Sequence, residues 1–110
     1  MPFVPERGDA IWITLDPQAG HEQQGRRPAV VLSPRAYNNS AGLVVACPIT
    51  SRVKGYPFEV VIPSGLAVDG AILSDQVKSL DWRVRKATRK GTVSAEELAD
   101  VRAKILAFIG

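Results

Sequence analysis

The fold is set by an apolar stretch in the first third of the chain, Pro28-Ala29-Val30-Val31-Leu32-Ser33, which Pro34 ends. Four apolar side chains follow one another here, without the alternation expected of a half-exposed strand. A short continuous run rich in β-branched residues is typical of a strand that is buried on both faces. We therefore expect the protein to be built around strands.

Further strands are predicted on both sides of this one. Residues 10–15 are β-branched and aromatic and lie between Gly8-Asp9 and Asp16-Pro17, which favours a strand. Residues 18–27 are polar with two glycines, which predicts a long exposed loop. Polar residues 35–40 predict a turn. The remaining strands are expected at residues 43–49, 58–62, 70–73 and 91–93.

The C-terminal segment changes from strand to helix periodicity. Ser94 stands three residues before Glu97, which is the capping-box pattern of a helix start. Apolar residues then recur every three or four positions, at Leu98, Val101, Ile105 and Phe108. Five or six short strands followed by one helix predict a mainly β fold, a strongly bent sheet or partly open barrel with the C-terminal helix docked on it.

Length and composition describe an ordinary globular chain. The 110 residues are 45% hydrophobic and 23% charged, and this length fits a single domain over residues 1–110. The net charge of +3 is a weak indication of an anionic partner. Cys47, the single cysteine, lies in an apolar run and is expected to be a buried, inert thiol. Without a signal peptide or a membrane-spanning run, we expect a cytoplasmic protein with no membrane partner.

The residue sets of common hydrolases are missing from the sequence. One histidine and one cysteine cannot form the usual zinc cluster. The carboxylates Asp16, Glu22, Asp75 and Asp81 are too scattered to predict a magnesium site. His21 has no Gly-x-Ser-x-Gly motif to complete a Ser-His-Asp arrangement, and no phosphate-binding Gly-x-x-x-x-Gly-Lys loop is present. We expect neither a metal nor a cofactor.

Basic and hydroxyl side chains remain as candidates for chemistry. Arg26-Arg27 immediately precedes a buried strand that would hold a guanidinium rigidly, and guanidinium geometry matches phosphate oxygens. Thr50 stands where another buried strand gives way to a polar loop. Residues 82–90 place five basic side chains after Trp82, as on a surface that binds a phosphate backbone. Solvated arginines, a turn hydroxyl and a charged edge strand are the simpler interpretations of the same three features.

Several motifs in a fixed order make the chain similar to a known family. They are Gly8-Asp9-Ala10-Ile11-Trp12, Glu22-Gln23-Gln24-Gly25-Arg26-Arg27-Pro28-Ala29-Val30-Val31-Leu32-Ser33, Cys47-Pro48-Ile49-Thr50, Lys54-Gly55-Tyr56-Pro57-Phe58-Glu59-Val60 and Ser74-Asp75-Gln76-Val77-Lys78-Ser79. Over nearly its whole length the chain resembles the MazF/PemK/Kid family of toxin endoribonucleases. The resemblance implies a small SH3-like barrel of the CcdB/PemK type, a symmetric homodimer, and cleavage of single-stranded RNA at short sequence motifs.

The resemblance also implies roles for individual residues. The arginine of the family's Arg-Pro junction and the threonine after its third strand correspond to Arg27 and Thr50, the expected catalytic pair. Together with the basic clusters, the matched segments give a set of expected RNA-binding residues, namely Glu22, Gln23, Arg26, Lys54, Asp75, Gln76, Lys78, Arg85 and Lys86.

RNA carries its own nucleophile, so the implied cleavage needs no metal. Attack by the ribose 2′-OH on the adjacent phosphorus would leave a 2′,3′-cyclic phosphate and a 5′-hydroxyl. Arg27 is assigned to stabilising negative charge, because a guanidinium pKa above ~12 makes it a poor base. Glu22 and His21 are the open candidates for the general base.

Two further expectations concern partners and alternatives. A cognate antitoxin with an acidic, disordered tail is expected to cover a surface formed by residues 18–27, Lys54 and residues 82–90. Two other functions stay open on the same fold. One is a non-enzymatic toxin of the CcdB type that poisons DNA gyrase by binding, and the other is a plain nucleic-acid-binding barrel.

Overall fold

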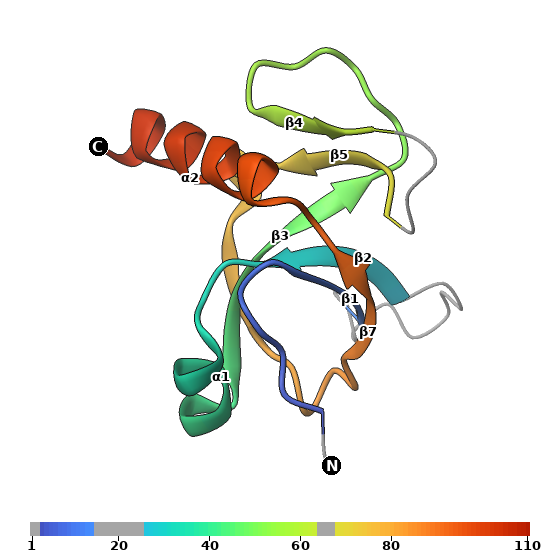
Figure 1. Cartoon of the computed structure of the whole chain (residues 1–110), viewed down its shortest axis with the longest axis vertical. Coiled ribbons are helices and arrows are strands. Elements are labelled where there is room, and N and C mark those ends of the chain that lie inside the picture. The colour runs from blue at the N-terminus through green and yellow to red at the C-terminus, as the bar shows by residue number, and fades with distance from the viewer. Residues whose placement is uncertain (1–2, 15–25, 64–67) are drawn as a thin grey trace.

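The computed structural model describes residues 3–14, 26–63 and 68–110. Seven strands and a C-terminal helix confirm the predicted mainly β fold (Figure 1). The elements in chain order are β1 (Asp9–Thr14), β2 (Arg26–Val31), α1 (Arg35–Ala41), β3 (Leu43–Thr50), β4 (Glu59–Ile62), β5 (Gly70–Leu73), the 3-10 helix η1 (Ser74–Gln76), β6 (Lys78–Asp81), β7 (Thr88–Thr92) and α2 (Ala95–Ile109).

The strands form one curled antiparallel sheet in the order β4-β5-β3-β2-β1-β7. β3 is its central strand, because β2 pairs with one of its edges while β5 and β6 pair with the other. Ala46 shows this directly, since it faces Val31 on one side and Lys78 on the other. The short helix η1 separates β5 from β6 along that edge.

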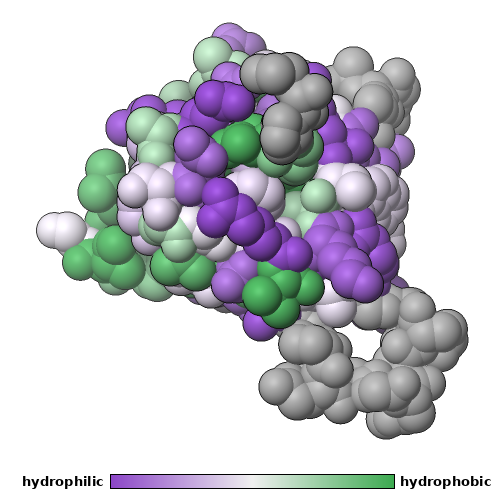
Figure 2. Space-filling view, turned by 90° about the horizontal axis from the view of Figure 1, so that it is seen from below, coloured by the Kyte–Doolittle hydropathy of each residue, from purple (hydrophilic) through white to green (hydrophobic). Residues whose placement is uncertain are grey.

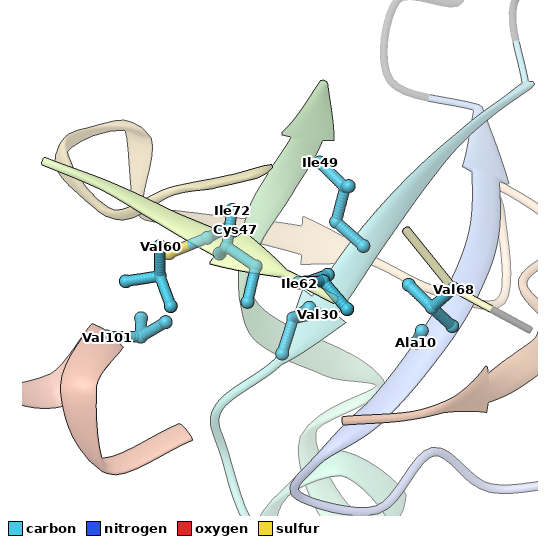
Figure 3. Close-up of a cluster of buried hydrophobic side chains, with 9 residues drawn as sticks. All are labelled: Ala10, Val30, Cys47, Ile49, Val60, Ile62, Val68, Ile72 and Val101. Atoms are coloured by element: carbon cyan, nitrogen blue, oxygen red, sulfur yellow. The ribbon is translucent and has the colours of Figure 1, made fainter. Parts of the chain in front are cut away.

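Both faces of the sheet are buried at its centre, as the apolar run of β2 predicted. Ala29, Val30 and Val31 are fully buried, and their alternation divides them between two clusters. Val30 joins the cluster on the α2 side (Figure 3), whereas Ala29 and Val31 join the cluster that includes Trp82. Cys47 belongs to the first cluster, and burial raises the pKa of its thiol to about 12, which fits the predicted inert thiol.

The predicted C-terminal helix is confirmed, including its start. In α2 the Ser94 hydroxyl accepts the Glu97 N–H at 3.1 Å, and the Glu97 carboxylate accepts the Ser94 N–H at 2.9 Å. Val101 is fully buried against the sheet. Phe108, which the periodicity placed on the buried face, is 42% exposed and contacts Phe58 edge-on. In the described part of the chain, no helix has the length and apolar character needed to cross a membrane.

The turn predicted at residues 35–40 is wrong, because these residues form the helix α1. A tertiary contact that sequence periodicity does not reveal anchors the helix. Asn38 is fully buried, and its amide nitrogen donates to the carbonyl oxygens of Pro5 and Ser33 at 2.9 and 3.0 Å. The Trp82 indole N–H donates to the Asn38 carbonyl at 2.8 Å. One polar side chain therefore replaces the apolar face that usually holds a helix.

Two other predicted boundaries are corrected, and one strand was missed. Arg26 and Arg27 lie within β2 and not in the preceding loop. β6 was not predicted, because Lys78–Asp81 contains only one strongly apolar residue, Leu80. β7 begins at Thr88, so Arg89 and Lys90 of the basic segment belong to an edge strand. That position supports the simpler interpretation of a charged edge for this part of the segment.

Candidate active site

Arg27 and Thr50 lie at the ends of two neighbouring strands. The β2–β3 pairing ends at Ala29 and Pro48, and Arg27 and Thr50 each lie two residues beyond these last paired positions. Arg27 faces Ile13 of β1, and Thr50 faces Ala71 of β5. The structure thus places the two expected catalytic residues at the same end of the β2–β3 pair, beyond its last paired residues.

The neighbouring arginines of β2 project from opposite faces of the sheet, because they are consecutive residues of one strand. The Arg26 guanidinium donates to the Lys86 carbonyl at 2.7 Å, the Thr88 hydroxyl at 3.0 Å and the Arg85 and Trp12 carbonyls at 3.3 Å. It therefore ties the end of β1 to the segment before β7. This contact gives Arg26 a structural role that its assignment to RNA binding did not include.

The Arg27 side chain, in contrast, is exposed and makes no hydrogen bond or ion pair with any described residue. Its backbone is nevertheless fixed on both sides, by pairing with Ile13 of β1 and by the buried residues that follow it in β2. A guanidinium on a rigid strand whose donors have no partner in the described ranges is suited to bind a phosphate or a carboxylate.

Thr50 combines a turn role with a free donor. Its hydroxyl oxygen accepts the Arg52 N–H at 3.1 Å, as the simpler interpretation of Thr50 as a turn hydroxyl predicted. The hydroxyl hydrogen can still donate to a ligand. Gly70 packs against the Thr50 backbone, and a Cβ on Gly70 would lie 2.3 Å from the Thr50 carbonyl oxygen. Thr50 is thus held closely from the β5 side.

The loop that follows Thr50, residues 51–58, is ordered by two acidic side chains. The Glu59 carboxylate accepts the backbone N–H groups of Lys54 and Gly55 at 3.1 and 3.0 Å. The Tyr56 hydroxyl donates to the Asp75 carboxylate, and this hydrogen bond raises the pKa of Tyr56. The Lys54 ammonium makes no hydrogen bond or ion pair with the described residues.

Asp75 and Gln76 belong to η1 and lie beside this loop through the Tyr56 contact. The second carboxylate oxygen of Asp75 and the Ser74 hydroxyl are buried without a partner among the described side chains and backbone. Lys78 follows in β6 and is exposed on the same sheet face as Leu80. The expected RNA-binding residues Lys54, Asp75, Gln76 and Lys78 are thereby grouped around β3 and its continuation.

Arg85 and Lys86 lie elsewhere. They belong to the turn between β6 and β7, at the bottom of Figure 1, whereas the loop that carries Lys54 lies above β4 at the top. The Arg85 guanidinium donates to the Thr14 carbonyl at 2.7 Å. Figure 2 views the molecule from the side of this turn, where hydrophilic side chains run between separate apolar patches. Within a single chain, the turn that carries Arg85 and Lys86 and the loop that carries Lys54 therefore do not form one compact site.

Some expected site residues lie outside the described residues. These are Glu22, Gln23 and the candidate base His21. In the ranges 3–14, 26–63 and 68–110, no three His, Cys, Asp or Glu side chains gather closely enough to hold a metal ion.

Glu59 and Gly70 were not singled out from the sequence, although both contact the segment around Thr50. A lone glutamate that opens a strand resembles any exposed strand residue, and only its burial, with 9% of its surface exposed, distinguishes it. Gly70 had a usable signal, because a glycine at the start of a strand often marks close approach of another backbone. Trp12 was also not predicted as a site residue. Its ring forms a cation–π contact with Lys90, whose ammonium lies 4.5 Å from the ring centre.

An open groove of about 530 Å³ adjoins Thr50. It is lined by residues of the loop after β3 and by both strands of the β4–β5 pair, namely Ser51, Val53, Val61, Ile62, Pro63, Asp69 and Gly70. Val61 faces Ala71, which in turn faces Thr50. The groove therefore borders Thr50 through Ser51, the next residue of the chain, and through Gly70, which packs against the Thr50 backbone.

Comparison with known proteins assigns the chain to a family. Residues 6–109 match the family of PemK-like, MazF-like toxins of type II toxin-antitoxin systems. This chain belongs to the PemK/MazF toxin family. The endoribonuclease toxin MazF of Escherichia coli K12 is 56% identical over 108 residues, which cover 98% of this chain and 96% of that protein. The endoribonuclease toxin ChpB of the same strain is 36% identical and covers 94% of this chain and 93% of its own.

Solved structures of PemK/MazF toxins agree with this assignment. Crystalline MazF from Deinococcus radiodurans is 53% identical, with a TM-score of 0.90 and coverage of 99% of both chains. A MazE-MazF crystal structure from the same organism gives 47% identity and a TM-score of 0.89, and covers 99% of this chain and 98% of that chain. The likeness confirms the fold class expected from the sequence.

Proposed function

We propose that this PemK/MazF toxin is an endoribonuclease that cleaves single-stranded RNA without a metal ion. The observation that carries the proposal is the position of Arg27 and Thr50 at the same end of the β2–β3 pair, with the Arg27 guanidinium free of partners among the described residues. The relatives of similar length that are named endoribonucleases support the same activity.

The proposed reaction uses the ribose 2′-OH as the nucleophile. Its oxygen bonds to the adjacent phosphorus while its proton passes to the general base, the bond from phosphorus to the 5′ oxygen breaks, and the leaving oxygen takes a proton from water. The products are a 2′,3′-cyclic phosphate and a 5′-hydroxyl. Negative charge grows on the non-bridging oxygens, where Arg27 supplies charged donors and Thr50 supplies a neutral one.

The general base is proposed among residues outside the described part of the chain, with Glu22 and His21 as candidates. Two nearby carboxylates are already engaged. Both oxygens of Glu59 accept backbone N–H groups, and Asp75 accepts the Tyr56 hydroxyl.

We further propose that the toxin acts as a homodimer in the cytoplasm, and that an antitoxin with an acidic, disordered tail inhibits it. The MazE-MazF crystal structure of the relative supports the existence of a protein partner. The exposed basic side chains of Arg27, Lys54 and Lys86 offer partners for carboxylates, since the groups that hold phosphates also hold carboxylates.

The decisive experiment is cleavage of a defined single-stranded RNA by the purified toxin in EDTA. We expect fragments whose ends are cyclic phosphate and 5′-hydroxyl by mass spectrometry. A substrate with deoxyribose at the cleaved position should bind and stay intact. Products with 5′-phosphate ends, or cleavage that requires added metal, would contradict the proposed reaction.

The same experiment distinguishes the two other functions. A toxin of the CcdB type would leave RNA intact and inhibit DNA gyrase in a supercoiling assay. A plain nucleic-acid-binding barrel would bind RNA and do neither. Arg27 and Thr50 at the same end of the β2–β3 pair favour the cleaving function, because binding alone does not require a hydroxyl together with a guanidinium that has no partner among the described residues.

A further inference from the structure

The backbone of the loop between β3 and β4 is held from within by one buried carboxylate. Glu59 opens β4, opposite Leu73 of β5, and is only 9% exposed. Its carboxylate accepts the Lys54 N–H with both oxygens, at 3.1 and 3.3 Å, and the Gly55 N–H at 3.0 Å. A buried carboxylate without partners would strongly destabilise the fold. Here its partners are two consecutive backbone amides of the loop.

The conformation of the loop suits this contact. The N–H groups of Lys54 and Gly55 point to the same acceptor, and Gly55 then has a φ of +78°, which lets the chain turn back toward Glu59 after the two amides. The Glu59 N–H closes the turn by donating to the Tyr56 carbonyl at 3.0 Å. The position of the Lys54 Cα is therefore coupled to the position of the Glu59 side chain.

This coupling reaches the candidate site through its short connection. Thr50 is the last residue of β3, and the Arg52 N–H donates to its hydroxyl at 3.1 Å. Lys54 is only two residues further along, and its ammonium makes no hydrogen bond or ion pair with described residues. An ammonium on a fixed backbone can bind a phosphate without an ordering cost. The same group on a flexible loop binds more weakly, because the loop loses conformational entropy when it becomes ordered.

We propose that the carboxylate of Glu59 is a positioning group for RNA binding, which places Lys54 beside the Arg27 and Thr50 pair. This inference rests on the proposed function. Glu59 does not contact RNA in this scheme, since its oxygens are occupied by the loop amides. Its loss should weaken RNA binding and leave the chemical step nearly unchanged, because Arg27 and Thr50 are held by the sheet and not by the loop.

The test is a double-mutant cycle between Glu59 and Lys54, read on a single-stranded RNA with deoxyribose at the cleaved position. We expect Glu59→Ala to raise Kd roughly tenfold, as for one lost charged contact, and to raise KM similarly with kcat within about threefold. Adding Glu59→Ala to Lys54→Ala should raise Kd by less than about twofold, because the group being positioned is already gone. Additive effects of the two substitutions would overturn the proposal.

A second readout needs no RNA. Exchange of the Lys54 and Gly55 backbone amides, followed by NMR, should become faster in Glu59→Ala than in the wild type. Glu97→Ala is the matched control, because it removes a carboxylate–backbone bond at the start of α2, and it should leave these two amides and Kd unchanged. Faster exchange with an unchanged Kd would show that loop order does not matter for binding, and would overturn the proposal.

Glu59→Gln covers the case in which Glu59→Ala does not fold. A neutral amide oxygen binds the two N–H groups more weakly, so amide exchange and Kd should both rise, by about two- to threefold. A glutamine variant that changes neither quantity, or only one, contradicts a role for the carboxylate. If the wild type binds RNA without cleaving it, the proposed function fails, while Kd and amide exchange still decide the role of Glu59.

Discussion

At the scale of single residues, the two arginines of β2 differ in what their side chains already do. Arg27→Ala should lower cleavage by about 10²–10³-fold or more, as for loss of a transition-state donor, without lowering stability. Arg26→Ala should lower the free energy of unfolding by about 1–2 kcal/mol, because four hydrogen bonds to the segment before β7 and to β1 are lost. Cleavage rates and urea unfolding of both variants check this. Equal loss of stability in the two would contradict the division of roles.

Thr50→Ala should reduce cleavage less than Arg27→Ala, since a neutral hydroxyl is a weaker donor than a guanidinium. The single-turnover rate at saturating RNA is the quantity to compare. A larger effect of the threonine substitution would mean that its hydroxyl does more than donate one hydrogen bond.

Gly70 is the residue where a single methyl group should do the most damage. In Gly70→Ala, the new Cβ would lie 2.3 Å from the Thr50 carbonyl oxygen at a φ of +107°. We expect a loss of about 2–3 kcal/mol in unfolding free energy from strain and displacement of the β3 end. Gly55→Ala is the control, because its φ is also positive at +78° but no atom lies within 4 Å of the added Cβ. It should cost about 1 kcal/mol, and equal losses would rule out the collision.

At the scale of secondary-structure elements, α1 depends on one polar side chain. Asn38→Ala removes the amide that donates to Pro5 and Ser33 and accepts the Ser33 hydroxyl. Because the polar groups of Pro5 and Ser33 that lose their partner are buried, we expect the free energy of unfolding to fall by about 2–3 kcal/mol. Denaturant unfolding measures the loss, with exposed Asn39→Ala as the control. A change below about 0.5 kcal/mol would contradict the anchoring role of Asn38.

The helix α1 also shows why the sequence predicted most of the fold but not all of it. Strands such as β2, β3 and β5 are recognisable because their apolar runs report burial directly, and α2 because its capping box and periodicity are local. α1 and β6 lack such a pattern and were not predicted. Asn38 holds α1, and pairing with β3 holds β6, through contacts between residues that are distant in the sequence. The candidate site follows the same division. Arg27 and Thr50 border predicted strands, whereas the contacts of Glu59 with Lys54 arise only from folding.

At the scale of the whole molecule, stability should carry a pH dependence from Asp9. Burial raises the pKa of this carboxyl above its ordinary value of 3.8, although the Glu6 N–H and Arg89 act in the opposite direction. The folded state then holds the proton to higher pH than the unfolded state. Stability from this group is therefore highest below pH 3.8 and falls as pH rises from there through the folded-state pKa.

Asp9→Asn should remove this component. The difference in unfolding free energy between wild type and Asp9→Asn, measured by urea denaturation from pH 3 to pH 7, isolates Asp9 from the other carboxylates. We expect the wild type to lose stability relative to the variant as pH rises. A difference that stays constant with pH, or changes in the other direction, would contradict the cause assigned to the shift.

Control by an antitoxin also belongs to this scale, because the basic regions lie far apart on the chain (Figure 1). With principal extents of 34 × 32 × 29 Å, an extended tail needs about ten residues to cross the molecule, at roughly 3.3 Å each. We expect an acidic tail of at least this length to compete with a non-cleavable RNA, and to do so less well as salt rises. Competition titrations at two salt concentrations test this. Simultaneous binding without mutual loss of affinity would place inhibition elsewhere.

Because Arg26 and Arg27 are consecutive in β2, inserting one residue after them and deleting one of them should affect the toxin differently. If the apolar part of β2 keeps its register, an extra residue after Arg27 moves that arginine into the place of Arg26 and leaves an arbitrary side chain in the place of Arg27. We expect the encoded protein to stay folded and to lose its toxicity, because the proposed catalytic guanidinium is displaced. Loss of one residue there should have the reverse effect, because Arg26 takes the place of Arg27 and its hydrogen bonds to Lys86 and Thr88 disappear. For a cell that escapes its own toxin by mutation, we therefore expect a three-nucleotide insertion at this point to yield a harmless protein, and the corresponding deletion to yield a less stable toxin that keeps its guanidinium.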